Sequence, residues 1–180
     1  MHCRTVIISL TGTPGTGKTT VGKLLEQRGM HTIELSDLIK ERNLYDSFDA
    51  ERNSYDVDPE VLDEAISAMK ITDDCVLIGH LSHYLTCDKI IVLRCKPSIL
   101  AKRLNSRGWK ESKVKENIEA EALDVILIEA VETDREVSEI DTSNLSAEEV
   151  CDAIIKIKAG ETANYVPGNI DWSEEVLEWY

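Results

Sequence analysis

Eight consecutive residues near the start of the chain, Gly12 to Thr19, match the phosphate-binding pattern G-x-x-x-x-G-K-[ST] at every position. They follow an apolar, β-branched run, Thr5 to Leu10, and stand at the head of a segment with helical apolar spacing that begins at Lys18. Glycines let a backbone turn its N–H groups onto phosphate oxygens, and a helix N-terminus adds partial positive charge. A chance glycine turn is remote in this strand–loop–helix order, so the sequence predicts binding of ATP with Mg²⁺.

Each residue type in this loop suits one part of a bound nucleotide. We expect Lys18 to reach the β- and γ-phosphates as a catalytic point charge, and Thr19 to present its hydroxyl to Mg²⁺. Thr20, which comes next, can bond the α-phosphate. Further nucleotide contacts are expected from the loop itself, at Gly12, Gly15, Thr16 and Gly17.

Strand-like and helix-like runs alternate along the 180 residues, which predicts one α/β domain with a parallel sheet flanked by helices. The expected strands lie at residues 5–10, 32–35, 75–78, 89–93 and 137–140. The expected helices lie at residues 18–27, 58–69, 97–108, 113–131 and 146–157. Ser146 and Glu149 form a capping-box pattern at the start of the last helix. The polar stretch 36–57 is expected to form a flap, and the acidic, aromatic residues 161–180 a surface-packed tail.

Charge and composition narrow the classes of partner. The net charge is −14, which opposes binding of bulk nucleic acid or anionic membrane but can attract a basic protein. Hydrophobic residues make up 42%, as in a soluble enzyme, and the longest apolar stretches are too short to cross a bilayer. The N-terminus shows no signal-peptide pattern, and the five cysteines, Cys3 among them, are scattered. Reduced thiols and a cytoplasmic location are therefore expected.

Basic side chains and one aspartate outside the loop are candidates for acceptor binding. Asp37 follows the second expected strand, beside Lys40, and is interpreted as lining an acceptor pocket, which is compatible with capping a helix. Arg103 and Arg107 lie four residues apart, hence on one face of their expected helix. Arginine's planar fork suits the charge spread over a transferring phosphoryl group. Both arginines, Arg107 above all, are therefore expected at the active site rather than on a solvated helix face.

The carboxylate of a Walker B motif is missing from the third expected strand. P-loop enzymes normally hold the waters of Mg²⁺ with an aspartate at the end of a core strand, but this strand ends Ile78-Gly79-His80. His80 is interpreted as polarising water or touching the metal's water shell; the alternative is a structural hydrogen-bonding histidine, and His83 lies nearby. The loop 141–144 after the last strand either contacts the adenine or turns the chain.

Several of these motifs together resemble the archaeal and eukaryotic nuclear adenylate-kinase-like ATPases. The resemblance rests on residues 12–20, Ser36-Asp37-Leu38, Leu44-Tyr45-Asp46, His80 and Arg103-Leu104…Arg107-Gly108-Trp109. It covers roughly residues 5–158, and residues 113–129 are similar to that family's lid-following helix. Many families share the P-loop alone; the histidine in place of a Walker B acid, combined with the R-G-W run, is more specific.

The resemblance implies a P-loop nucleoside-monophosphate-kinase fold with an acceptor-binding flap near 34–57 and a short lid near 106–116. It implies reversible γ-phosphoryl transfer from ATP to AMP, slow ATP hydrolysis, and a role in maturation of the small ribosomal subunit and its rRNA. Small-subunit ribosomal protein eleven is an implied partner, whose basic tail would suit this acidic chain. Carried over residue by residue, nucleotide contacts fall on Gly15, Gly17, Lys18, Thr19, Thr20 and Arg107, and the Walker B histidine on His80.

Two positions depart from the eukaryotic members of that family. They keep an aspartate two residues before the histidine, where this chain has Ile78, and an arginine in the flap, where this chain has Lys40. Lysine lacks the bidentate phosphate grip of arginine, so acceptor specificity is expected to be loose.

Three functions remain open at this point. The first is a broad-specificity nucleoside monophosphate kinase with ATPase activity. The second is a ribosome-assembly ATPase switch whose kinase activity is incidental. The third is a kinase for a small metabolite; a hydroxyl acceptor would need a base, for which Asp37 is the candidate.

Overall fold

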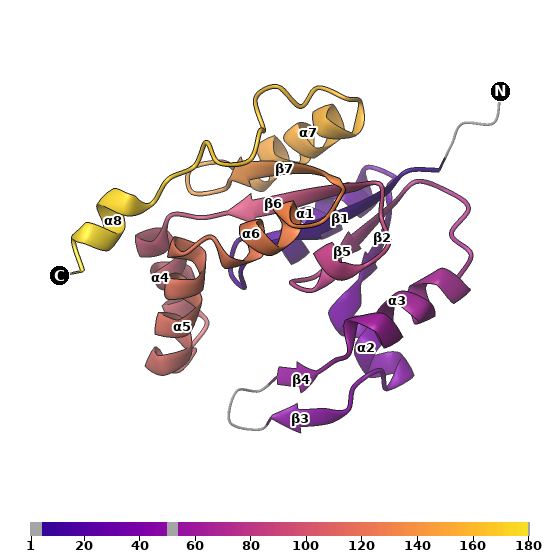
Figure 1. Cartoon of the computed structure of the whole chain (residues 1–180), viewed down its shortest axis with the longest axis horizontal. Coiled ribbons are helices and arrows are strands. Elements are labelled where there is room, and N and C mark those ends of the chain that lie inside the picture. Colours follow the sequence, from indigo (N-terminus) through magenta and orange to yellow (C-terminus); the bar gives the residue numbers. More distant parts are fainter. Residues whose placement is uncertain (1–4, 50–53, 180) are drawn as a thin grey trace.

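A five-stranded parallel sheet lies at the centre of the chain, in the order β2-β5-β1-β6-β7 (Figure 1). The computed structural model describes residues 5–49 and 54–179; Cys3, residues 50–53 of the expected flap and Tyr180 lie outside them. The sheet confirms the predicted α/β fold. Its strands are β1 (Ile7–Thr11), β2 (His31–Glu34), β5 (Cys75–Ile78), β6 (Lys89–Arg94) and β7 (Glu136–Asp141).

Helices cover both faces of this sheet. Leu10, Ile78 and Ile91 pack beneath α1 and α7 on one face, while Leu77 and Val92 belong to the cores under α3 and α6 on the other. Because side chains alternate along a strand, β5, which is covered on both faces, is apolar throughout. The helices are α1 (Lys18–Gln27), α2 (Leu35–Arg42), α3 (Pro59–Ala68), η1 (Ser82–Tyr84), α4 (Pro97–Ser106), α5 (Glu111–Ala122), α6 (Val125–Val131), α7 (Ala147–Lys158) and α8 (Ser173–Leu177).

The expected flap is a small substructure beside the sheet. It consists of α2 and an antiparallel pair, β3 (Ser47–Asp49) and β4 (Ser54–Asp56), and it lies apart from the central sheet in Figure 1. Tyr55 packs against Tyr45 and Phe48, with ring centroids 4.6 and 5.1 Å apart. These aromatic contacts give the flap a packed face of its own.

The single helix expected over residues 113–131 is wrong, because the chain forms two helices there. α5 ends at Ala122 and α6 begins at Val125. Between them Asp124 has a φ of 56°, in the left-handed region that few non-glycine residues adopt, and its carboxylate accepts a hydrogen bond from Arg94. The break lets α5 pack on α4 while α6 lies on the sheet.

The start of α7 follows the expected pattern, and the tail beyond it packs on the core. Ser146 and Glu149 form the predicted capping box at α7. In the tail, Glu175 accepts a hydrogen bond from the backbone N–H of Ser98, 2.8 Å away, and pairs with Lys96 at 3.0 Å.

Among the described residues, no helix has the length and apolar character that a bilayer crossing requires.

A buried cation at the end of β6 connects these parts. Arg94, which is 1% exposed, donates to Glu121 (2.8 Å), to Glu139 (3.1 Å) and to Asp124. Glu139 in turn accepts the backbone N–H groups of residues 169 and 170 in the tail. The guanidinium also lies 6.0 Å from the ring centroid of Trp172. One side chain thus joins the sheet, the α5–α6 junction and the tail.

Replacing Arg94 with methionine is expected to destabilise the fold strongly. The substitution leaves the buried carboxylates of Glu121 and Glu139 without their cation, and removing one partner of a buried ion pair costs about 3–5 kcal/mol. Urea denaturation of wild type and Arg94→Met measures the free energy of unfolding.

Lys89→Met on the same strand is the matched control. Lys89 pairs with Glu136 at 2.6 Å where Glu136 is half exposed, so this loss should cost about 1 kcal/mol or less. Equal effects of the two substitutions would show that the Arg94 cluster has no special weight in stability.

Candidate functional site

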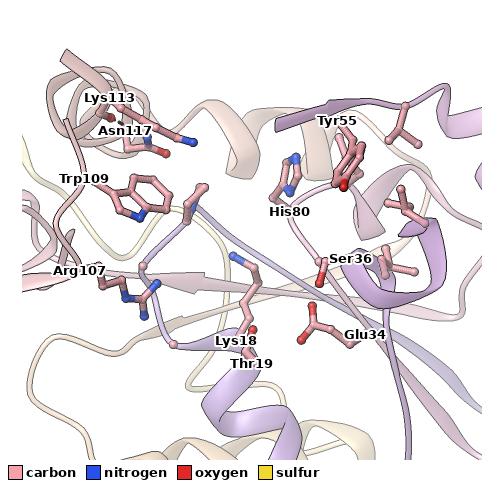
Figure 2. A pocket seen from close by; sticks show the side chains of 18 of the residues that line it. Lys18, Thr19, Glu34, Ser36, Tyr55, His80, Arg107, Trp109, Lys113 and Asn117 are labelled. Atoms are coloured by element: carbon pink, nitrogen blue, oxygen red, sulfur yellow. Dashed lines mark hydrogen bonds between the residues drawn. The ribbon is translucent and has the colours of Figure 1, made fainter. Parts of the chain in front are cut away.

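A cavity of about 820 Å³ opens beside the P-loop, at the edge where the parallel strands end. Figure 2 shows Lys18 and Thr19 in the middle, with Arg107, Trp109, Lys113 and Asn117 on one side and Glu34, Ser36, Tyr55 and His80 on the other. The first group comes from the turn after α4 and from α5, and the second from β2, the flap and the segment after β5. The P-loop therefore lies between a lid wall and a flap wall.

Three glycines of the P-loop have positive φ angles: 135° at Gly12, 98° at Gly15 and 108° at Gly17. A Cβ on Gly12 would lie 2.3 Å from the carbonyl oxygen of Leu93, and one on Gly15 would lie 2.8 Å from leucine side chains of α4. L side chains rarely adopt these angles, and Gly12 and Gly15 also leave no space for a side chain, so glycine is required at both; at Gly17 the angle alone favours glycine. Gly15 and Gly17 line the cavity; Gly12 stands behind it.

Of the other expected nucleotide contacts, Thr19 and Thr20 line the cavity and Thr16 does not. Thr16 is buried, and its hydroxyl donates to the carbonyl oxygen of Thr13, 2.9 Å away. Its side chain therefore fixes the loop from within. Thr13 is likewise buried and donates to Glu121 of α5 at 2.5 Å, so a helix of the lid wall holds the phosphate loop directly.

The ammonium of Lys18 faces main-chain oxygens of its own loop. Nζ donates to Gly12 at 2.5 Å and to Thr13 at 3.1 Å. Burial lowers the pKa of Lys18 to about 8; the nearby carboxylates of Glu34 and Glu121 raise it, and the charge of Arg107 lowers it. A phosphate group would supply the negative partner that stabilises the ammonium form.

The two arginines of the expected helix face do not act together. Arg107 lines the cavity, but it is the C-cap of α4 rather than part of the helix. Arg103 does not line the cavity; it donates to the side chain and carbonyl oxygen of Thr142 at 3.2 and 2.7 Å. Because α4 ends at Ser106, the four-residue spacing of Arg103 and Arg107 does not place their side chains on one helix face. In the same wall as Arg107, the ammonium of Lys113 lies over the ring of Trp109, 4.4 Å from the ring centroid.

The loop 141–144 is tied to the protein at Thr142. This side chain is buried, and its hydroxyl lies 2.9 Å from the carbonyl oxygens of Thr16 and Arg94. None of residues 141–144 lines the cavity around the P-loop. The contacts of Thr142 correspond to the chain-turning alternative; a contact of this loop with adenine stays a prediction.

On the flap wall, Lys40 lines the cavity as expected and Asp37 does not. Asp37 is exposed in the first turn of α2, whose N-cap is Glu34, so it caps no helix. Its place in the wall is taken by Glu34, Ser36 and Tyr55. Sequence reasoning missed Glu34. The available signal was that Glu34 ends β2, a parallel strand, and that such strands end at the same edge of the sheet as the P-loop.

The two histidines have different surroundings. His80 lines the cavity, and desolvation of its ring within the cavity lowers its pKa to about 4, with a smaller contribution from the charge of Lys18. His80 is therefore neutral at pH 7. His83 is buried, with Nδ1 3.0 Å from the Thr11 hydroxyl and Nε2 3.1 Å from Glu129. It links β1 to α6 and has a structural place.

Comparison with known proteins agrees with this architecture. A family model described as an AAA domain matches residues 8–124. A shikimate kinase from Acinetobacter baumannii, solved with shikimate, has a TM-score of 0.61 at 15% identity, covering 88% of this chain and 96% of that one. The YorR protein from Bacillus subtilis, solved with phosphorylated GDP, has a TM-score of 0.58 at 19% identity, covering 86% and 96%. At these identities the likeness shows the fold alone.

Archaeal relatives are far more similar in sequence. Proteins carrying the name "Putative adenylate kinase" are 41% identical in Methanosarcina mazei, over 95% of this chain and 100% of that protein, and 43% identical in Archaeoglobus fulgidus, over 95% and 94%. The one from Methanocaldococcus jannaschii is 41% identical over 96% of both chains. Fold and loop thus define a P-loop α/β protein of the small-kinase architecture. Within that class, the chain belongs to the family of these archaeal proteins.

The lowered pKa of Lys18 predicts how nucleotide affinity depends on pH. A triphosphate binds the ammonium form of Lys18, so the affinity for nucleotide should have its full value below pH 7. It should fall as the pH rises through about 8, and the decrease should approach about tenfold per pH unit above that. Calorimetry with a non-hydrolysable ATP analogue and Mg²⁺ between pH 6.5 and 9.5 measures this. Proton uptake on binding at the alkaline end is the accompanying signature, and an affinity that stays flat over the range would contradict it.

Proposed function

We propose that this chain is a nucleoside monophosphate kinase that transfers the γ-phosphoryl group of ATP to AMP in the cytoplasm. The observation that carries the proposal is that the P-loop lies between a lid wall and a flap wall that line one shared cavity. A donor nucleotide on the loop and an acceptor under the flap would meet there. The name carried by the archaeal relatives supports the same reaction.

Three of the cations that line the cavity would stabilise the transferring group. Lys18 lies at the centre and Arg107 in the lid wall (Figure 2), and Lys40 of α2 lines the same cavity. Such a transfer places charge on the equatorial oxygens of the phosphoryl group, and fixed cations stabilise that charge without reorganising. An AMP acceptor is already a phosphate anion, so catalysis by this chain is positioning and charge stabilisation, and closure of the lid would exclude water.

The donor groups beside the P-loop fit a magnesium ion. The Thr19 hydroxyl is exposed at the cavity, and oxygen ligands with retained waters are what Mg²⁺ prefers in phosphotransferases. When bound, the ion neutralises charge on the β- and γ-phosphate oxygens. Thr19 is the residue of the loop that would hold it.

An acceptor panel tests the proposal. ATP consumption is followed with AMP, CMP, GMP, small alcohols and no acceptor, for wild type and Lys18→Ala. We expect AMP to give the largest rate and the other monophosphates to be accepted at lower rates, because the one-point phosphate contact of Lys40 leaves acceptor specificity loose. Lys18→Ala is expected to abolish turnover with all of them. Turnover with alcohols and none with monophosphates would overturn the proposal.

We also propose that the chain hydrolyses ATP slowly and acts in maturation of the small ribosomal subunit and its rRNA, by binding small-subunit ribosomal protein eleven. The net charge of −14 supports a basic partner. The no-acceptor arm of the panel measures the hydrolysis.

A pull-down with that ribosomal protein, with and without ATP, measures the association. We expect capture in at least one nucleotide state and release at high salt, because the attraction is between exposed charges. Absence of capture in both nucleotide states would remove the ribosomal part of the proposal and leave the kinase part standing.

A further inference from the structure

The carboxylate of Glu34 lies near the P-loop at the end of β2, whereas a Walker B acid would be expected at the end of β5. In the parallel sheet the ends of β2, β5 and β1 form one row, with Glu34 in register with Ile78 and Ile78 in register with Leu10. Ile78 is the position at which a Walker B acid would be expected. Glu34 is therefore its direct neighbour on the next strand, about 4.8 Å further from β1.

The side chain of Glu34 points to the face of the sheet that carries the P-loop helix. Ile33, the preceding residue, belongs to the core on the α3 face, whereas Ile78 packs beneath α1. Because side chains alternate along a strand, Glu34 points to the α1 face. The N-terminus of α1 holds Lys18 and Thr19, and Figure 2 shows the Glu34 carboxylate directed toward both.

The local partners of Glu34 match a role toward a cation at Thr19. It is the N-cap residue of α2, but its side chain makes no capping hydrogen bond there. It is half-buried in the cavity wall, where burial raises the pKa of its carboxyl, while the nearby Thr19 side chain and the charge of Lys18 act to lower that pKa. A glutamate is one methylene longer than an aspartate, which offsets part of the extra strand spacing.

The other candidates on the cavity wall are less suited. His80 brings no negative charge, because an imidazole is either neutral or positive. Glu116 also lines the cavity, but from α5, the helix of Lys113 and Asn117 in the opposite wall. Asp37 is exposed outside the cavity. Glu34 is thus the carboxylate on the Thr19 side.

We propose that Glu34 supplies the carboxylate that holds the water shell of Mg²⁺ next to Thr19, in place of the acid absent from β5. This inference rests on the proposed function only in that the chain binds ATP with a divalent cation. Its role is that of a positioning residue, since it acts on the ion through water and touches no reacting atom.

The test measures metal affinity apart from turnover. Mn²⁺ is titrated into protein saturated with a non-hydrolysable ATP analogue and followed by electron paramagnetic resonance, while calorimetry in EDTA gives the metal-free affinity for the analogue. Glu34→Gln keeps the shape and removes the charge. We expect it to weaken Mn²⁺ binding about 10–100-fold, as loss of an outer-shell partner does, and to leave metal-free affinity equal or tighter.

Two further variants make the result specific. Glu34→Asp keeps the charge but retracts it, so it should lie between wild type and Glu34→Gln. Glu41→Gln, the same substitution at an exposed site on α2, should match wild type. Unchanged Mn²⁺ affinity in Glu34→Gln, or equal loss of nucleotide affinity with and without metal, would overturn the inference. A wild type that binds the metal–nucleotide complex normally yet phosphorylates no monophosphate would instead refute the kinase proposal and leave Glu34 in place.

Discussion

The buried contact between Arg94 and Glu121 sets the geometry on which the site depends. One carboxylate oxygen of Glu121 accepts from the guanidinium and from the backbone N–H of Cys95, while the other accepts from Thr13 in the P-loop. A charge this deeply buried is tolerated only when its partners are fixed, because any displacement leaves it uncompensated. The end of β6, the phosphate loop and the last turn of α5 are therefore held in one arrangement.

This contact places the lid wall relative to the phosphate loop. α5 carries Lys113 and Asn117 in the cavity wall and Glu121 at its buried end. Since a helix is a stiff element, fixing Glu121 against Thr13 fixes the base about which the rest of α5 and the Arg107 turn would move. The same carboxylate also raises the pKa of Lys18 against the effect of burial, so it contributes to keeping the phosphate-binding ammonium charged.

The parts of the fold that depend on local sequence were predictable, and those that depend on distant partners were not. The P-loop, the strands and the Ser146 capping box follow from short patterns, and parallel strands bring their ends together at one edge. The break at Asp124 was not visible, because an aspartate in a left-handed conformation is stabilised by Arg94, thirty residues away. Arg103 was misplaced for a related reason: its helix ends one residue before Arg107, and the partner that turns it, Thr142, is remote in sequence.

The parallel arrangement of the strands explains how a carboxylate on β2 could take the role that a Walker B acid on β5 has in other P-loop proteins. In a parallel sheet, neighbouring strands present register partners to the same face, so Glu34 and Ile78 are adjacent positions at one edge. Ile78 contributes an apolar side chain to the core beneath α1, where a Cβ on Gly22 would lie 2.3 Å from it. An acid at 78 would have to leave that packing, whereas the end of β2 borders the cavity and already bears a charge. Packing favours the apolar residue on the inner strand, and the negative charge beside Thr19 then comes from the outer one.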